Sequence, residues 1–395
     1  MKNIISGFIY FLVGSSVLLI ILIIIVTFSS QMFDFQAPGR EATGDIDPDL
    51  INSPRGILPD NAITVSVSPG VRLSEAVLYD GEFELPVNGA TGYAAVSLDV
   101  SDGDFSVTLA VLDPGEAFVI LKEDGQFWQI NAGGTGNIIG WVRHDHCMIN
   151  LPDVIPSMIY NNTNAYSSLL MANLEDIPNI SGERLYSYSG RRDGKAWNER
   201  LQRYEYIVPV LYATAKRIYQ AQLNALANGD TIIMYEAFRP YSVQELIYNE
   251  VSALPSSQKN FGSWSQSMFI AGGTSNHQTG YAVDVSLGNV ISADYMVSGR
   301  YKYPQLRYIE YQMPSMLHEL SIASAVYTSP GSRTFSEGMQ NSESAMNLHR
   351  YCTGAGFSPL ASEWWHFSDG HTAAALTRQS DGRYYITEVL SVPPG

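Results

Sequence analysis

The sequence predicts an α+β fold that follows a small all-β region and an N-terminal membrane-spanning helix. Three observations support this prediction. Residues 7–28 carry no charge, residues 61–150 consist of short alternating apolar runs, and the chain after Leu151 mixes helical and strand-like periods. The expected parts are a transmembrane signal-anchor (1–30), a linker (31–60), an all-β region (61–150) and a mixed α and β domain (151–395).

The composition limits the classes of function. The 395 residues include 23 Lys and Arg against 39 Asp and Glu, a net charge of −16, and 45% are hydrophobic. This hydrophobic share excludes wholesale disorder, and an acidic chain lacks the basic surface that nucleic acid requires, so no nucleic-acid partner is expected. Two cysteines, Cys147 and Cys352, exclude a disulfide scaffold, while one disulfide or two free thiols remain open.

The uncharged run at residues 7–28 predicts a single membrane-spanning helix. Its 22 residues, at a rise of about 1.5 Å each, reach about 33 Å, which is enough to cross a bilayer. A cleaved signal peptide is the alternative, but Ser29-Ser30-Gln31 is a poor cleavage site. Lys2 before the span and Asp34 after it favour an inner N-terminus and a body outside the cell membrane. Four prolines indicate a linker at residues 31–60.

Turns that contain Gly and Asp separate the short runs of residues 61–150, and this pattern predicts a small barrel or sandwich. The segment Leu112–Val142 resembles a bacterial SH3-type domain, because Pro114-Gly115-Glu116 opens it and Gly140-Trp141-Val142 closes it. The resemblance implies a module that binds cell-wall peptide or glycan, or that only spaces an enzyme. Trp128 and Trp141 can instead be core residues.

The sequence His144-Asp145-His146-Cys147 closes the all-β region and has the composition of a metal site. Contiguous residues rarely converge on one ion, so a solvated loop is predicted there.

Helical and strand-like periods alternate after Leu151. Apolar residues spaced by three and four predict a long helix over residues 197–227, kinked or broken at Pro209. A second helix is predicted at residues 342–357, closed by Gly354 or Gly356. Strands are predicted at residues 231–238, 280–287, 363–368 and 383–390.

His277, Asp284 and His366 are candidate metal ligands, with Glu363 available as a general base. Two imidazoles and one carboxylate form a typical catalytic zinc set. Spacing alone does not establish the site, because His277 and Asp284 have opposite parity in an ideal strand. The same holds for Glu363 and His366. A turn at Thr279-Gly280 would unite the first pair, and the second requires Glu363 in a loop before the strand.

Four motifs in order resemble those of the zinc D-Ala-D-Ala peptidases, a family that includes the vancomycin-resistance-type D,D-carboxypeptidases and D,D-dipeptidases. The pattern S-x-H-x-x-G-x-A-x-D runs from Ser275 to Asp284, and E-x-x-H runs from Glu363 to His366. Glu236–Tyr241 resembles the family's G-Y-R-P strand end, and Asn347–Phe357 resembles the helix before the last motif. The resemblance covers roughly residues 150–370.

The resemblance implies a central antiparallel sheet flanked by helices, and a Zn²⁺ ion held by His277, Asp284 and His366. It makes Glu363 the catalytic base, and it directs Arg239 at the carbonyl oxygen as that atom gains negative charge. The implied reaction is attack of zinc-bound water on a peptide carbonyl, without an acyl-enzyme.

The resemblance also bears on the substrate. Ser275 would position it, and of the alternately placed Trp364 and Trp365 we assign Trp365 to the cleft. In the dipeptidase branch an acid binds the substrate's free ammonium. Here His318 stands at that position, with Glu319 as a neighbouring substitute. A buried ammonium needs a partner, so the prediction is a D,D-carboxypeptidase that acts on peptidoglycan stem peptides. Separately, we expect the enzyme to be a monomer.

Three alternatives stay open: a D-Ala-D-Ala dipeptidase, an L,D-carboxypeptidase or peptidoglycan endopeptidase, and an inactive wall-binding protein. Zinc content together with hydrolysis of a D-Ala-D-Ala peptide separates the last of these from the enzymes.

Overall fold

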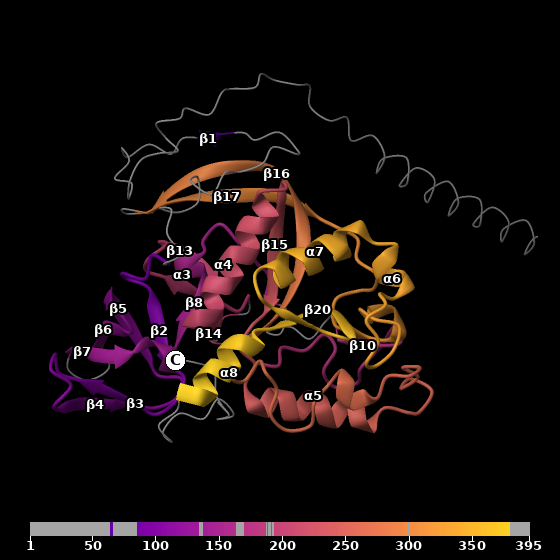
Figure 1. Ribbon diagram of the computed structural model, residues 1–395, viewed down its shortest axis with the longest axis horizontal. Helices are drawn as coiled ribbons and strands as arrows, with labels where there is room; N and C mark the ends of the chain where they lie inside the picture. Colours follow the sequence, from indigo (N-terminus) through magenta and orange to yellow (C-terminus); the bar gives the residue numbers. More distant parts are fainter. Residues whose placement is uncertain are drawn as a thin grey trace, which may run out of the picture. The chain divides into compact units, whose positions relative to one another are not determined.

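The computed structural model describes residues 64–65, 85–133, 137–162, 170–186, 188, 191, 193–298 and 301–379. All of these described residues belong to one compact unit. The predicted membrane span, the predicted linker and the strand predicted at 383–390 lie outside the described residues. Among the helices that are described, none is long and apolar enough to cross a membrane. The predicted mixture of helices and sheets is confirmed (Figure 1).

The first large sheet has eight strands, every neighbouring pair antiparallel, in the order β14-β8-β2-β5-β6-β7-β3-β4. Its strands are β2 (Thr91–Ala94), β3 (Leu98–Ser101), β4 (Thr108–Leu112), β5 (Ala117–Asp124), β6 (Phe127–Ala132), β7 (Ile138–Arg143), β8 (Cys147–Asn150) and β14 (Pro209–Leu211). Because β14 comes from beyond residue 150, segments before and after that residue share one sheet and one core.

Trp128 of β6 lies in that shared core and is fully buried. Its ring centroid is 4.8 Å from that of Tyr212, the first residue of helix α4 (Tyr212–Leu226). Glu123 accepts hydrogen bonds from both, from Trp128 Nε1 at 3.3 Å and from the Tyr212 hydroxyl at 3.0 Å. Trp128 is therefore a core residue. The SH3-type assignment of Leu112–Val142 stays a prediction.

The sequence His144–His146 forms a short 3-10 helix, η2, and not the solvated loop that the sequence predicted. The three residues are half-buried, and the His144 ring packs 5.1 Å from Tyr212. Its Nε2 lies 3.0 Å from the carbonyl oxygen of Gly125. The composition of this segment reflects packing between β7, β8 and α4. Cys147 and Cys352 are both free and buried.

The second large sheet holds the order β19-β20-β16-β15-β9, with β1 and β17 also paired to β16. Its pairs are antiparallel except β15 with β9, so the expected central sheet is present and mostly antiparallel. The strands are β1 (Thr64–Val65), β9 (Ile159–Tyr160), β15 (Asp230–Glu236), β16 (Ala282–Ser298), β17 (Tyr301–Glu310), β19 (Ser358–Leu360) and β20 (Glu363–Ser368).

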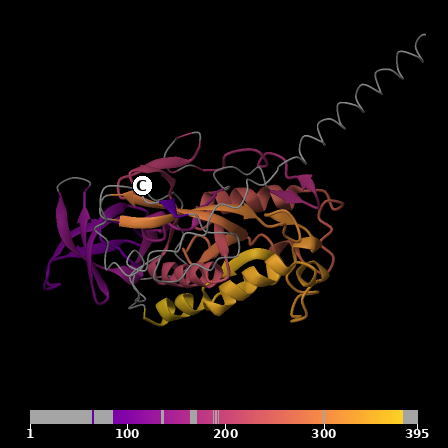
Figure 2. The same cartoon turned by 90° about the horizontal axis from the view of Figure 1, so that it is seen from above.

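Helices cover both sides of this sheet. Helix α4 packs on β15 and against α7 (Glu343–Gly354), and both lie on one side of the strands (Figures 1 and 2). Helix α5 (Tyr241–Ala253) lies on the other side, where it builds a second apolar core. The shorter elements are α3 (Leu151–Val154), β10 (Met171–Ala172), β11 (Glu175–Asp176), η5 (Gln266–Met268), β18 (Glu319–Leu320), η6 (Ile322–Ser324), α6 (Glu337–Gln340) and α8 (Gly370–Gln379).

The predicted helix over residues 197–227 is wrong in its first half. Strands β12 (Lys195–Asn198) and β13 (Arg203–Tyr206) form a hairpin, and β14 follows before α4 begins at Tyr212. Pro209 has no N–H for a helix, and aromatic and β-branched residues favour a pleated strand. Trp197 and Tyr204 pair across the hairpin, so an apolar spacing that suits a helix face here serves a strand pair.

The other elements predicted within the described residues overlap those of the structure, although the strand predicted at residues 280–287 runs from Ala282 to Ser298 as β16. Helix α7 begins after Ser342, whose hydroxyl accepts a hydrogen bond from the Ala345 amide. It ends before Gly356, which has a φ of +93°, the left-handed conformation that closes helices.

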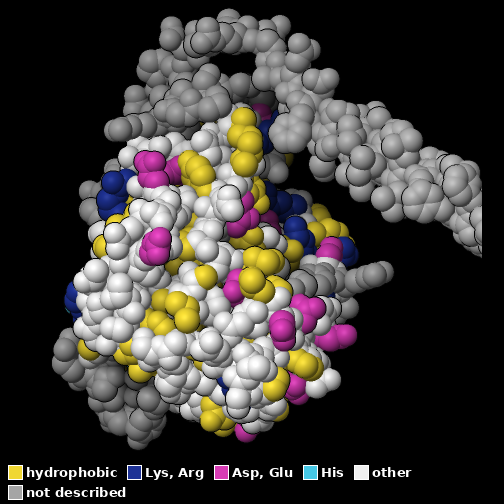
Figure 3. All heavy atoms as spheres, turned by 90° about the vertical axis from the view of Figure 1, so that its right-hand side faces the viewer, with side chains coloured by type: hydrophobic (Ala, Val, Ile, Leu, Met, Phe, Trp, Pro, Cys, Tyr) yellow, Lys and Arg dark blue, Asp and Glu magenta, His cyan; other side chains and the backbone are white. Residues whose placement is uncertain are grey.

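The face drawn in Figure 3 carries scattered acidic and basic side chains and no extended basic area.

Candidate metal centre and active site

Neighbouring strands of the second sheet place three ionisable side chains in one row. Glu236 ends β15 and pairs with Asp284 of β16 across a register shift. Asp284 in turn pairs directly with His366 of β20. Directly opposed residues of antiparallel strands have Cβ atoms about 4.5–5.5 Å apart and point to the same face. The three buried side chains therefore meet above one end of the sheet.

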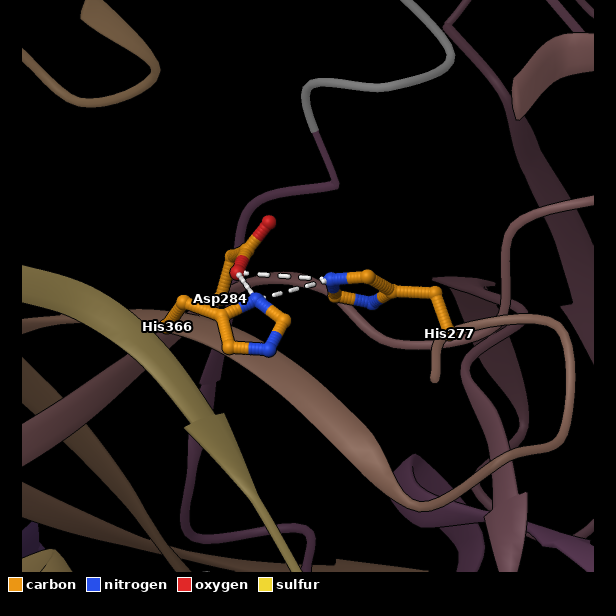
Figure 4. Close-up of side chains that lie close together, drawn as sticks. All are labelled: His277, Asp284 and His366. Atoms are coloured by element: carbon orange, nitrogen blue, oxygen red, sulfur yellow. Dashed lines mark hydrogen bonds and ion pairs between the residues drawn. The ribbon is translucent and has the colours of Figure 1, made fainter. Parts of the chain in front are cut away.

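His277 joins them from the turn that precedes β16. Its Nε2 lies 3.2 Å from His366 Nδ1 and 3.5 Å from Asp284 Oδ1 (Figure 4). His366 Nδ1 lies 3.0 Å from the same carboxylate oxygen. The three predicted ligands are thus brought together, and each offers one donor atom within 4.8 Å of the others.

The turn depends on Gly280, as the sequence predicted. Its φ is +76°, in the left-handed region that disfavours residues with a Cβ atom. The Gly280 amide donates to the His277 carbonyl at 3.3 Å, and the Gly280 carbonyl accepts from the Leu211 amide at 2.8 Å. Because the chain turns between His277 and Asp284, the parity of an ideal strand does not separate them.

A bulge brings Glu363 to the side of His366. Glu363 is the first residue of β20 and not a loop residue, so this detail of the prediction is wrong. The register of β19 against β20 shifts between Pro359 and Leu360, and such a shift changes the direction of side chains along the bulged strand. Glu363 Oε2 consequently lies 3.9 Å from His366 Nδ1.

Hydrogen bonds to neighbouring groups orient both imidazoles. His277 Nδ1 lies 2.7 Å from the carbonyl oxygen of Ala237, which can only accept, so Nδ1 carries a hydrogen and Nε2 is the atom that faces the other two side chains. Burial lowers the pKa of His366, which favours its neutral form, and its Nε2 lies 3.0 Å from the Ser368 hydroxyl. Two imidazoles with their outer nitrogens bonded, beside a carboxylate, fit the donor set of a catalytic Zn²⁺.

The pKa values of the two carboxylates Asp284 and Glu363 are shifted in opposite directions. Burial alone would raise the pKa of Asp284, but the neighbouring His277 and hydrogen bonds from His318 and His366 hold that pKa well below its usual value. Burial raises the pKa of Glu363 well above its usual value, and the negative charge of Asp284 adds to this rise. One carboxylate stays ionised and the other takes up a proton readily, which is the division that acid–base catalysis requires.

The Arg239 guanidinium is held in place by Glu236 and Gln244. Its Nε donates to Glu236 Oε1 at 2.8 Å, Nη2 donates to the other oxygen of that carboxylate, and Nη1 donates to Gln244 Oε1 at 2.6 Å. Three of the five N–H donors of Arg239 make these bonds, so donor capacity remains for a substrate. Sequence reasoning missed both partners, although Glu236 stands three residues before Arg239 in the same motif.

A second group of potential ligands consists of Glu236, Asp284 and His318. Arg239 already supplies the positive charge there, because its Nη2 contacts Glu236 and lies 3.6 Å from Asp284 Oδ2. Within the described part of the chain, the geometry therefore favours one metal position, at His277, Asp284 and His366.

All seven residues predicted for the site line one pocket of about 350 Å³. These are Arg239, Ser275, His277, Asp284, Glu363, Trp365 and His366. Trp365 is buried, and its ring lies 5.8 Å from that of His318, which also lines the pocket. Glu319 is buried in β18 and is not among the residues that line the pocket.

Comparison with known proteins adds an independent finding. Residues 210–307 match the family model VanY, described as D-alanyl-D-alanine carboxypeptidase. The match includes Arg239, Ser275, His277 and Asp284, and covers roughly a quarter of the chain. No curated protein matches the sequence. The family match supports a peptidase of the D-alanyl-D-alanine carboxypeptidase kind.

Proposed function

We propose that this protein is a zinc-dependent D,D-carboxypeptidase that removes the terminal D-Ala from peptidoglycan stem peptides. One observation carries the proposal: His277, Asp284 and His366 converge within hydrogen-bonding range, with Glu363 beside them, in a single pocket. The family match over residues 210–307 points to the same substrate class.

His277, Asp284 and His366 would hold the ion through Nε2, a carboxylate oxygen and Nδ1. When bound, Zn²⁺ supplies a Lewis acid that polarises a carbonyl group and makes water a better nucleophile. The protein's own contribution is to orient both imidazoles through their outer nitrogens, to favour the neutral form of His366 and to keep Asp284 ionised in a buried site.

Glu363 would act as the general base. It is buried beside the proposed ligands, and its raised pKa suits a group that takes a proton from the attacking water and then gives it to the leaving amine. Arg239 would bind the carbonyl oxygen as it gains negative charge. Its guanidinium is fixed in advance by Glu236 and Gln244, so little reorganisation is needed during the reaction.

Two observations favour a carboxypeptidase over a dipeptidase. By the sequence resemblance, His318 stands where the dipeptidase branch would carry its ammonium-binding acid, and in the structure its Nε2 faces Asp284 at 3.2 Å. Glu319, the proposed substitute, is buried in β18 and is not among the residues that line the pocket. Among the described residues, neither of these two positions would then offer a carboxylate to the free ammonium of a dipeptide. A stem peptide presents an amide at the same place and requires none.

We further propose that residues 7–28 anchor the enzyme in the cell membrane, with the catalytic part outside. The uncharged length of this run and the position of Lys2 before it support that orientation. A protease added to intact cells should then remove the catalytic part, whereas a cytoplasmic marker should survive.

The decisive experiment offers free D-Ala-D-Ala and a pentapeptide ending in D-Ala-D-Ala to the purified full chain loaded with Zn²⁺, with Glu363→Gln as the blank. Release of D-Ala from the pentapeptide alone is expected. Cleavage of the dipeptide alone would establish a dipeptidase and overturn the argument from His318. Zinc binding without hydrolysis of either peptide would favour an inactive wall-binding protein.

A further inference from the structure

The two oxygens of Asp284 face different partners. Oδ1 lies toward His366 Nδ1 at 3.0 Å and His277 Nε2 at 3.5 Å. Oδ2 lies toward His318 Nε2 at 3.2 Å and Arg239 Nη2 at 3.6 Å. Oδ1 is therefore directed at the proposed metal position. Oδ2 contacts side chains that are not among the proposed metal ligands.

His318 is built rigidly into this place. It is 5% exposed, and its ring meets that of Trp365 edge to face at a centroid distance of 5.8 Å. Its φ of +60° is uncommon for a residue with a side chain, and β18 follows it directly and pairs with β10. A strained conformation persists only where surrounding contacts fix it.

The hydrogen between His318 and Asp284 can be assigned by chemistry. An ionised carboxylate only accepts hydrogen bonds, so Nε2 of His318 must carry the hydrogen and donate it to Oδ2. Arg239 is a weaker candidate for this task, because its Nη2 lies farther away and already bonds Glu236.

We propose that His318 is a positioning residue that fixes Asp284, so that Oδ1 points at the metal position while Oδ2 is withheld from it. The inference rests on the proposed metal site. Partners that orient a metal ligand typically change metal affinity or activity by 10- to 100-fold when they are removed. His318 would thereby stand in place of the substrate-binding acid of the dipeptidase branch and orient a metal ligand instead of binding substrate.

The test compares His318→Phe with His318→Gln in the full chain. Phe keeps a ring against Trp365 but has no donor, whereas the Gln amide nitrogen can take the place of Nε2 and donate to Asp284. Zn²⁺ affinity of the metal-free proteins is measured by competition with a chromophoric chelator. We expect Phe to weaken Zn²⁺ binding roughly 10- to 100-fold and Gln to stay within a few-fold of wild type.

His318→Asn gives a third variant for the case in which Phe does not fold, because Asn tolerates positive φ and its shorter side chain ends near the position of Nδ1. It should lose affinity as Phe does. Wild-type affinity in the Phe or Asn variant, or equal losses in Phe and Gln, would overturn the positioning role. Wild-type protein that binds no Zn²⁺ would overturn the proposed metallopeptidase itself, which is a different result.

Discussion

Asp284 and His366 face each other as directly paired residues of β16 and β20, with Oδ1 and Nδ1 3.0 Å apart. Two of the proposed metal ligands are thus positioned by the hydrogen-bonding register of a sheet and not by loops. A register is strongly specified wherever one face of the sheet is buried, because a shift by one residue would turn every side chain to the other face. The site consequently inherits its precision from the core beneath it.

Replacing Glu363 by Gln should abolish turnover and leave the metal in place. Gln keeps the shape of the side chain but cannot take a proton, and general-base catalysis typically contributes a factor of about 10² to 10⁴. We expect kcat for D-Ala release to fall by that factor, with one Zn²⁺ per chain retained in elemental analysis.

Glu175→Gln is the matched control, because Glu175 is an exposed residue of β11. It should keep full activity. Loss of Zn²⁺ from the Glu363 variant would show that this carboxylate is a ligand and not the base.

The Glu363→Gln substitution should stabilise the metal-free protein at neutral pH. Burial raises the folded-state pKa of Glu363 above its unfolded value, so stability falls as pH rises through the interval between the two values. Each unit of difference corresponds to about 1.4 kcal/mol. Urea unfolding of the metal-free proteins should therefore favour Glu363→Gln at pH 7.5, and this advantage should shrink near pH 4. An equal difference at both pH values would contradict the assigned direction of the shift.

Local patterns were sufficient for some elements of the fold and insufficient for others. Residues 363–368 form the predicted strand, and Gly356 closes α7 because its sequence context and left-handed φ agree. The hairpin of β12 and β13 was not predicted, because Trp197 and Tyr204 satisfy a helical spacing as well as a cross-strand pair. Only the tertiary contacts decide between the two arrangements.

The candidate site shows the same limit. Motif residues such as His277 and Arg239 could be named from the sequence, and they do line one pocket. The contact between His318 and Asp284 joins positions 34 residues apart, and no local period encodes it. The bulge that turns Glu363 toward His366 is likewise a property of the strand pairing.

Removing the metal should lower stability only when Asp284 is intact. A ligand that binds only the folded state stabilises it by about 2.7 kcal/mol at a free concentration of 100 times Kd. We expect a chelator to lower the Tm of wild type, and Asp284→Asn to have a Tm that hardly responds to Zn²⁺ or chelator. Asp294→Asn, a half-buried acid of the same strand β16, should respond as wild type does. A full Zn²⁺ response in Asp284→Asn would remove this carboxylate from the ligand set.

The turn at Gly280 links backbone strain to metal binding. An Ala at this position would have to adopt a φ of +76°. Its Cβ would lie 3.2 Å from the Leu211 amide nitrogen and 3.1 Å from Met148 Cε. We expect Gly280→Ala to lower the free energy of unfolding by about 1–3 kcal/mol, since the conformational cost alone is about 1–2 kcal/mol.

Gly182 provides the comparison for Gly280, because its φ is +81° but no atom lies within 4 Å of the methyl group that an Ala would add. Both Ala variants carry the backbone cost of a positive φ, and only Gly280→Ala adds close contacts, so the difference between their free energies of unfolding in urea measures those contacts. Zn²⁺ affinity should separate them, because only Gly280 donates to the His277 carbonyl and sets the direction of that ligand. Equal Zn²⁺ affinities in the two variants would mean that His277 is held by its Ala237 hydrogen bond alone, independently of the turn.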